Sequence, residues 1–267
     1  MPHSHRIAPG EKVDLSKIST RGKEYHDDRD QADREFKRFR NELDDLQTRL
    51  YAEGRQKLLI VLQAMDAGGK DGVTRSVFKE VNPQGIRIES FKAPSAEELS
   101  HDYLWRIHQR VPAKGMIAVF NRSHYEDVLV VRVDELVPKK MWEARFEQIN
   151  QFEKYLSDNG TRILKFFIHI SREEQLERFQ ERLDDPEKHW KFSIDDIKKR
   201  QKWDKYMAAY EDVLSKCSTD YAPWHVIPGD HNWYRNWAVA QVITETLHEM
   251  NPQYPPLAEG LKGLKLE

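Results

Sequence analysis

The residues best suited to chemistry lie in a glycine-rich segment between an apolar run and a helix-compatible stretch, and include Asp66 and Lys70. Glycines let backbone N–H groups turn toward a ligand, a helix amino end adds partial positive charge, and a lysine neutralises phosphate oxygens. The order of strand, loop, Gly-Lys pair and helix is typical of a phosphate-binding P-loop. We therefore expect a phosphate cradle with Asp66 and Lys70 as catalytic groups. The other loop residues expected to bind phosphate or nucleotide are Ala67, Gly68, Gly69, Asp71 and Gly72.

The loop departs from the general P-loop pattern at two positions. Ala64 replaces the first glycine, and Asp71 replaces the serine or threonine that binds magnesium. Another residue must then hold the metal, and Asp66 offers the hard oxygen ligand that magnesium prefers. The alternative is a helix-capping turn with a solvated lysine. The order of the elements and the aspartate inside the loop favour phosphate binding.

Two cations follow the loop on the same predicted helix. Arg75 and Lys79 are one turn apart, so they project from one face near the phosphate end. They either bind anions beside the cradle or form a solvated face, and the sequence leaves both readings open.

A second group of charged residues follows the third predicted strand. P-loop enzymes often place an aspartate at this strand end to hold the water shell of the metal, but here the residue is Asn121. Glu126 and Asp127 come shortly after and carry the missing charge. Arg122 and Arg132 can meet phosphate oxygens bidentately. Surface salt bridges would explain the same residues, but both turns should converge on one crevice, so we expect Glu126 to be a metal ligand and Asp127 to bind phosphate or nucleotide.

The histidine in this second turn, His124, is expected to be structural. Phosphoryl transfer depends mainly on positioning and charge neutralisation, so a general base contributes little.

A basic segment after the fourth predicted strand has the pattern of a lid. Ser171 caps a helix that contains Arg178, and the break DDPEKHWKFS that follows includes Lys188. Such a segment can close over a polyanion and exclude water, which competes as a phosphoryl acceptor. The alternative is a charged interhelix loop.

Alternating apolar runs and helical patterns position these motifs. Strands are predicted over 57–63, 86–91, 115–120, 163–170 and 224–227, and helices over 70–81, 95–110, 139–158, 172–184, 193–216 and 233–250. This alternation predicts an α/β fold with a parallel sheet covered by helices on both faces. Ligands bind such sheets outside the carboxyl ends of the strands, where every motif above falls.

The flanking segments divide the chain further. We expect an N-terminal arm on the surface over 1–30, a P-loop kinase-like domain over 31–250 with its lid at about 178–200, and a C-terminal tail over 251–267. An amphipathic helix is predicted over 31–52, with an apolar stripe formed by Phe36, Phe39, Leu43, Leu46 and Leu50. The stripe either forms an oligomer contact or packs on its own domain, and we expect a homo-oligomer.

Composition limits the environment and the partners of the chain. A net charge of −2, from 43 basic and 45 acidic residues, argues against nucleic acid as a partner. Cys217 is the only cysteine, which suits a reducing cytoplasm. The first residues lack an apolar signal segment, and the apolar runs are shorter than a membrane span of about 18 residues. We expect a cytoplasmic protein with no membrane partner.

Four segments taken together resemble the polyphosphate kinase 2 family. They are AMDAGGKDG, FNRSHYEDVLVVRV, RLDDPEKHWKF and YAPWHVIPGDHNWYRNW, and the resemblance runs from about residue 40 to residue 250. It implies a P-loop kinase core similar to thymidylate kinases, arranged as α/β/α layers with a helical lid. It also implies transfer of phosphoryl groups between polyphosphate and nucleotides with Mg²⁺, or with Mn²⁺ in its place.

The resemblance assigns roles to individual residues. Asp66 and Lys70 match the loop residues that act on metal and phosphate. Arg122 and Arg132 match arginines near the phosphates, and Arg178 matches the lid arginine. 

The residues of the second turn also indicate which nucleotide acceptors to expect. Members limited to nucleoside diphosphates tend to have DRSWYNR at the second turn, whereas this chain has Asn121 and Glu126. That pattern is similar to the subgroup (class III) that phosphorylates both AMP and ADP. The expected partners are therefore inorganic polyphosphate and the adenine nucleotides AMP, ADP and ATP.

Two other functions stay open at this point. One is a nucleoside monophosphate kinase with ATP as donor, which would share the fold. The other is a non-enzymatic nucleotide-binding module, which would need the glycine loop but neither a second carboxylate turn nor a basic lid.

Overall fold

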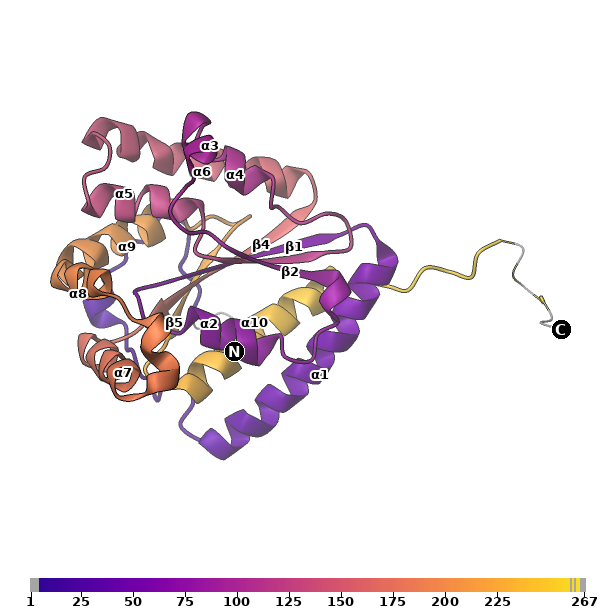
Figure 1. The fold of residues 1–267 in the computed structure, drawn as a ribbon. Helices are drawn as coiled ribbons and strands as arrows, with labels where there is room; N and C mark the ends of the chain where they lie inside the picture. The colour runs from indigo at the N-terminus through magenta and orange to yellow at the C-terminus, as the bar shows by residue number, and fades with distance from the viewer. Residues whose placement is uncertain (1–4, 260, 262, 265–267) are drawn as a thin grey trace.

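Five parallel strands form the centre of the molecule in a computed structural model, which describes residues 5–259, 261, 263 and 264 (Figure 1). The strand order is β2-β3-β1-β4-β5. The bounds are β1 Lys57–Ala64, β2 Ile86–Ser90, β3 Ile117–Asn121, β4 Thr161–His169 and β5 Trp224–Pro228. In the central strand β1, Leu58 to Leu62 are fully buried. Burial on both faces explains the uninterrupted apolar run of this strand.

The register brings two strand ends to the same edge. Leu62 of β1 pairs with Asn121, the last residue of β3. The backbone N–H of Arg122 then donates to the carbonyl of Leu62 at 3.1 Å. The glycine loop after β1 and the charged turn after β3 therefore leave the sheet side by side.

Helices cover both faces of the sheet, which confirms the expected α/β/α layers (Figure 1). On one face lie α1 Arg29–Glu53, α2 Lys70–Val77 and α10 Asn232–Met250. On the other lie α5 Val130–Val133, α6 Lys139–Asp158 and α9 Trp203–Cys217, with the short helices α3 Ala96–Ser100 and α4 Trp105–His108 beside α6. The 3-10 turns are η1 Leu15–Lys17, η2 Pro83–Gly85, η3 His124–Asp127 and η4 Pro186–Lys191.

Two of the predicted helices are interrupted. The helix expected over 95–110 is divided into α3 and α4 because Asp102 starts a new turn, accepting from the N–H of Leu104 at 2.9 Å. Such local side-chain bonds compete with a continuous helix. The helix expected over 193–216 is divided at Lys202 into α8 Ile194–Gln201 and α9.

The apolar stripe of α1 packs within its own domain. Phe39, Leu43, Leu46 and Leu50 are buried, and α1 lies along α10 (Figure 1). Of the two readings of this stripe, packing on the same domain is the one observed.

The N-terminal arm is mostly exposed or half-buried, but three of its apolar side chains reach the core, which the expectation of a surface segment did not include. Ile7, Val13 and Leu15 are buried in the main hydrophobic cluster. The N–H of Ile7 donates to the carbonyl of Trp224, and the N–H of Val226 donates to that of His5. The arm thus pairs with β5 and covers an edge of the sheet that would otherwise be open.

The expected lid lies at the same end of the molecule as the glycine loop. It consists of α7 Arg172–Asp184, then η4, then α8 (Figure 1). Among the described residues, no helix is both long and apolar enough to cross a bilayer.

Candidate active site

The glycine loop connects β1 to α2 and surrounds a buried lysine. Lys70 is only 8% exposed, and its Nζ donates to the carbonyls of Ala64 at 3.0 Å and Met65 at 3.4 Å. Gly69 has φ of +100°, and a Cβ there would lie 2.1 Å from Nη1 of Arg235. Glycine is favoured at this position, because a side chain would be strained at this backbone angle and its Cβ would displace the guanidinium of Arg235.

The lysine is prepared for an anionic ligand. Burial lowers the pKa of Lys70 to about 8, and the nearby Arg122 acts in the same direction. A phosphate placed beside both cations would offset this penalty. The loop can therefore hold phosphate by charge as well as by its backbone N–H groups.

Asp66 lies between cations from two distant parts of the chain. Its carboxylate accepts from Nη2 of Arg122 at 2.6 Å and lies 3.2 Å from Nζ of Lys199 on α8. Burial opposes ionisation, but Arg122, Lys70 and Lys199 outweigh it and hold the pKa of this carboxyl below its usual value. Asp66 is thus an ionised carboxylate that lines the loop cavity.

Arg122 connects the two turns, because it belongs to the turn after β3 and its side chain contacts the glycine loop. Its backbone is left-handed, with φ of +63°. A residue other than glycine in this conformation is strained, and such strain commonly marks a functional site. The guanidinium bonds Asp66 at 2.6 Å and lies 3.9 Å from Glu126.

Glu126 lies in η3 and is oriented by a glutamine from the central strand. With its amide turned to satisfy both groups, Gln63 donates to Glu126 Oε1 at 3.1 Å and accepts from Ser123. The loop and the second turn therefore converge, as the sequence predicts for Asp66, Lys70, Arg122 and Glu126.

A cationic cavity opens above the loop, and we call it the loop cavity. Lid residues line it together with the loop and the end of β3. Its lining holds more cations than carboxylates: the cations are Lys70, Lys92, Arg122, Arg178, Arg182, Lys188 and Lys191, and the carboxylates are Asp66, Asp71, Glu181 and Asp196. This concentration of positive charge suits a polyanion.

A second cavity of about 480 Å³, the apolar cavity, adjoins the first. Its apolar wall includes Phe91, Pro94, Leu99, Tyr103 and Val131. Its polar groups are Lys92, Glu98, His101, Arg106, Arg122, Glu126, Asp127, Arg145 and Lys199. The two cavities share Phe91, Lys92, Ala93 and Arg122, so they meet at Arg122. The volume of the apolar cavity falls in the range of small-molecule sites, about 300–1,000 Å³.

The lid contacts the loop directly. Nη1 of Arg178 donates to the carbonyl of Ala67 at 2.9 Å, and Nη2 donates to that of Gly229 at 2.6 Å. Gln175 donates to the carbonyl of Asp66 at 2.8 Å. Lys188 lines the loop cavity and pairs with Asp185 at 3.1 Å. Both expected lid cations therefore lie at the site.

Asp127 and the helix pair Arg75 and Lys79 lie at the borders of the site. Asp127 lines the apolar cavity and pairs with Arg145 at 3.0 Å, and burial raises its pKa to about 6. Arg75 and Lys79 are exposed and line a separate hollow beside β2. That hollow shares Asp71 and Asn121 with the loop cavity, so it continues the cavity outward.

Arg132 does not lie with the other predicted residues. Its guanidinium bonds Asp212 of α9 at 2.6 Å and stacks over the ring of Trp142 at 4.7 Å. The expectation that Arg132 lies near the phosphates is therefore corrected. The helical turn α5 starts at Val130 and directs Arg132 toward α9 rather than toward the loop.

The structure also adds residues that sequence reasoning missed. Lys199 contacts Asp66 from a run of surface-like cations on α8, which gave no local signal. Arg235 is buried behind Gly69 and Gly72, held by Asn232 at 2.6 Å. The family-like segment HNWYRNW contains Arg235, but only the fold places it behind the loop.

His124 is structural, as expected. It is fully buried, and its Nε2 lies 3.1 Å from Oε1 of Glu153 on α6. It lines neither the loop cavity nor the apolar cavity.

The fold and the site together define an α/β protein of the P-loop kinase type, built to hold phosphates beside a small apolar pocket. The sequence model of polyphosphate kinase 2 matches residues 26–255. The chain belongs to the polyphosphate kinase 2 family.

Individual relatives agree with this family. The AMP/ADP-polyphosphate phosphotransferase of Meiothermus ruber is 58% identical over 213 residues, which cover 80% of either chain. The ADP-polyphosphate phosphotransferase of Rhodopseudomonas palustris is 45% identical, covering 94% of this chain and 91% of the relative. The crystal structure of polyphosphate kinase 2 from Arthrobacter aurescens superposes with a TM-score of 0.89 at 41% identity, covering 95% of this chain and 91% of that one.

The acidic residues of the site fit a metal ion that binds together with substrate. Among the residues that the structure describes, no three or more His, Cys, Asp or Glu side chains gather into a metal site. Asp66 and Glu126 nevertheless approach the same guanidinium, Arg122. Magnesium is usually held by one or two carboxylates, substrate phosphates and water, and this pair could supply the carboxylates.

Proposed function

We propose that the protein transfers phosphoryl groups from inorganic polyphosphate to AMP and ADP, reversibly and with Mg²⁺ or Mn²⁺. The names of the relatives support these substrates. One structural observation carries the proposal: a cationic cavity and an apolar cavity meet at Arg122. Donor and acceptor bound on either side of one guanidinium would place the transferring phosphoryl group between them.

The loop cavity is the proposed donor site. Lys70, Arg178 and Lys188 face it, and its charge suits a chain of phosphates. The hollow with Arg75 and Lys79 continues it past Asp71. A polyphosphate longer than the cavity would run out along this hollow, which gives these two cations a role in binding.

The apolar cavity is the proposed nucleotide site. Phe91, Pro94 and Tyr103 offer surfaces for a base, and Arg145 and Asp127 offer polar partners at its side. The acceptor phosphate of the nucleotide would point toward Arg122 and Glu126, where the two cavities join.

Asp66 and Glu126 are the residues that would hold the metal. When bound, magnesium offsets negative charge on phosphate oxygens. The remaining work falls to the protein's own cations: Lys70 and the loop amides orient the donor, and Arg122 neutralises charge between donor and acceptor. Arg178 ties the lid to the loop, which would exclude water from the transfer.

The experiment mixes the protein with AMP, magnesium and long-chain polyphosphate in the absence of ATP. We expect ADP first and then ATP. An ATP-dependent monophosphate kinase would form neither, and it would convert AMP to ADP only after ATP is supplied. A binding module would produce no turnover with either donor.

We further propose a cytoplasmic location and a homo-oligomer. A single cysteine, Cys217, which is buried, supports a reducing compartment. Light scattering after size-exclusion chromatography measures the oligomer, and a mass equal to one chain would contradict it.

A further inference from the structure

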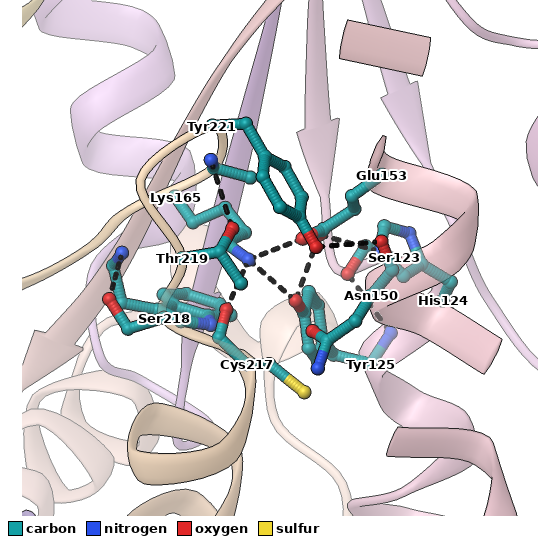
Figure 2. Close-up of polar contacts among 12 residues, drawn as sticks. Ser123, His124, Tyr125, Asn150, Glu153, Lys165, Cys217, Ser218, Thr219 and Tyr221 are labelled. Atoms are coloured by element: carbon teal, nitrogen blue, oxygen red, sulfur yellow. Dashed lines mark hydrogen bonds and ion pairs between the residues drawn. The ribbon is translucent and has the colours of Figure 1, made fainter. Parts of the chain in front are cut away.

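A cluster of buried charged side chains lies behind the second turn, outside both cavities (Figure 2). Its centre is an ion pair between Lys165 of β4 and Glu153 of α6, with 2.5 Å between Nζ and Oε2. Both side chains have no exposed surface. Lys165 also donates to the hydroxyl of Tyr125 at 2.8 Å and to the carbonyl of Cys217 at 2.6 Å, so all three of its protons are used.

The same glutamate holds two consecutive residues of η3. Oε1 of Glu153 accepts from the hydroxyl of Tyr125 at 2.8 Å, and Nε2 of His124 lies 3.1 Å away. A carboxylate only accepts, so this histidine nitrogen carries the proton. One side chain from α6 therefore fixes the two residues that immediately precede Glu126 (Figure 2).

The start of η3 is held by a separate set of hydrogen bonds. Ser123 Oγ accepts from the N–H of Tyr125 at 3.2 Å and bonds Gln63, whose amide reaches Glu126. The turn is therefore clamped from both sides, with Arg122 at its entrance and Glu126 within it.

Stability alone does not account for a buried ion pair. Removing two charges from water costs about as much as their attraction returns, and well-packed apolar residues of similar size are often equally stable. In some proteins buried polar groups instead serve to select one conformation. Here the cluster bonds two residues of η3 directly, His124 and Tyr125.

We infer that Glu153 and Lys165 are positioning residues, which hold η3 so that Arg122 and Glu126 face the acceptor phosphate. The expected effect on kinetics rests on the proposed function. The positioning of η3 does not, because it is a property of the fold. Loss of the cluster should loosen η3 and slow turnover, while the glycine loop continues to bind polyphosphate normally.

The principal variant is the double substitution Glu153→Gln and Lys165→Met, which removes both charges and leaves neither unpaired. A second variant, Tyr125→Phe, removes one of the two links between the cluster and η3, and it leaves the contact of His124 with Glu153 and the ion pair in place. If the double variant does not fold, Tyr125→Phe decides the question. The matched control is Tyr234→Phe, which removes a buried hydroxyl that bonds His5 at 2.8 Å and lines neither cavity.

Kinetics and hydrogen exchange are measured on each variant. We expect kcat to fall about tenfold or more with AMP and ADP, because small misplacements of reacting groups cost rate steeply. The KM for polyphosphate should stay within about twofold, and amides over 123–128 should exchange faster. The control should match the wild type in kcat and in exchange over 123–128.

Unchanged kcat and unchanged exchange over 123–128 in a folded variant would overturn the inference. So would an equal loss in every kinetic parameter, including the KM for polyphosphate, because that pattern indicates general damage. If the wild type itself lacks polyphosphate-dependent activity, the proposed function fails, and the exchange over 123–128 still decides whether the cluster positions η3.

Discussion

The two turns that form the site are held in place by different means. The glycine loop is built from its own backbone: Gly69 is left-handed, and Lys70 bonds the carbonyls of Ala64 and Met65 a few residues away. The η3 turn is held by side chains from far along the chain, with Glu153 of α6 and Lys165 of β4 behind it. The comparison indicates that the conformation of the glycine loop is set mainly by neighbouring residues, whereas that of η3 depends on tertiary contacts.

The largest expected effect concerns Asp66 of the glycine loop, which bonds Arg122 of the second turn. Asp66→Asn should lower kcat by about a thousandfold, because the site loses its metal-binding carboxylate and the partner of Arg122. The fold should persist, and circular dichroism with a thermal melt checks this. Turnover close to that of the wild type would contradict the role of Asp66.

The next effect tests the left-handed backbone of the glycine loop and its packing against Arg235. Gly69→Ala should lower kcat/KM for polyphosphate about a hundredfold, since its Cβ would meet buried Arg235. Gly54→Ala is the matched control, because Gly54 is also left-handed but has open space around it. It should cost about 1 kcal/mol of unfolding free energy and leave activity unchanged. Equal activity losses in the two variants would refute the packing argument.

The third prediction tests the second turn. Glu126→Gln should reduce kcat/KM with AMP by about tenfold to thirtyfold, because the site loses a metal-binding charge. The loss with ADP should be smaller, as the resemblance implies for this position. Initial rates with each acceptor at fixed polyphosphate measure the ratio, and equal losses with AMP and ADP would refute a specific role in AMP use.

The fourth prediction concerns pH. The pKa of Lys70 is lowered to about 8 by burial and by Arg122, so the ammonium is charged below that pH and loses its proton above it. The kcat/KM for polyphosphate should therefore fall about tenfold between about pH 7 and pH 9, reporting the free enzyme. A flat profile across this range would mean that Lys70 stays charged.

The smallest effect tests the correction at Arg132. Arg132→Ala should change kcat and the KM for polyphosphate by less than about threefold, because the side chain is bound to Asp212 outside both cavities. Loss of this pair and of the contact with Trp142 should cost about 1 kcal/mol of unfolding free energy. A loss of activity as large as that of an Arg122→Ala variant would indicate that Arg132 does act near the phosphates.

Local patterns were enough to predict much of the fold and the position of the glycine loop. The apolar runs of the strands, the periodicity of α1 and the glycine loop depend on neighbours in sequence, so the α/β layers were predicted correctly. The roles of Asp66 and Lys70 stay predictions. The same reasoning missed the breaks in the helices over 95–110 and 193–216. The first helix is interrupted by Asp102, whose side chain accepts from the backbone N–H of Leu104. A prediction from helix propensity averages over many residues and does not detect one such bond.

The amino-acid sequence by itself therefore determined the class of fold, the phosphate loop and the presence of charged groups after β3. Only the tertiary structure decided which of these groups meet. It brought Lys199 to Asp66, turned Arg132 toward Asp212, and placed Lys165 and Glu153 behind η3. The physical reason is that backbone angles and burial patterns are set by nearby residues, whereas ion pairs form between side chains that the chain path brings together.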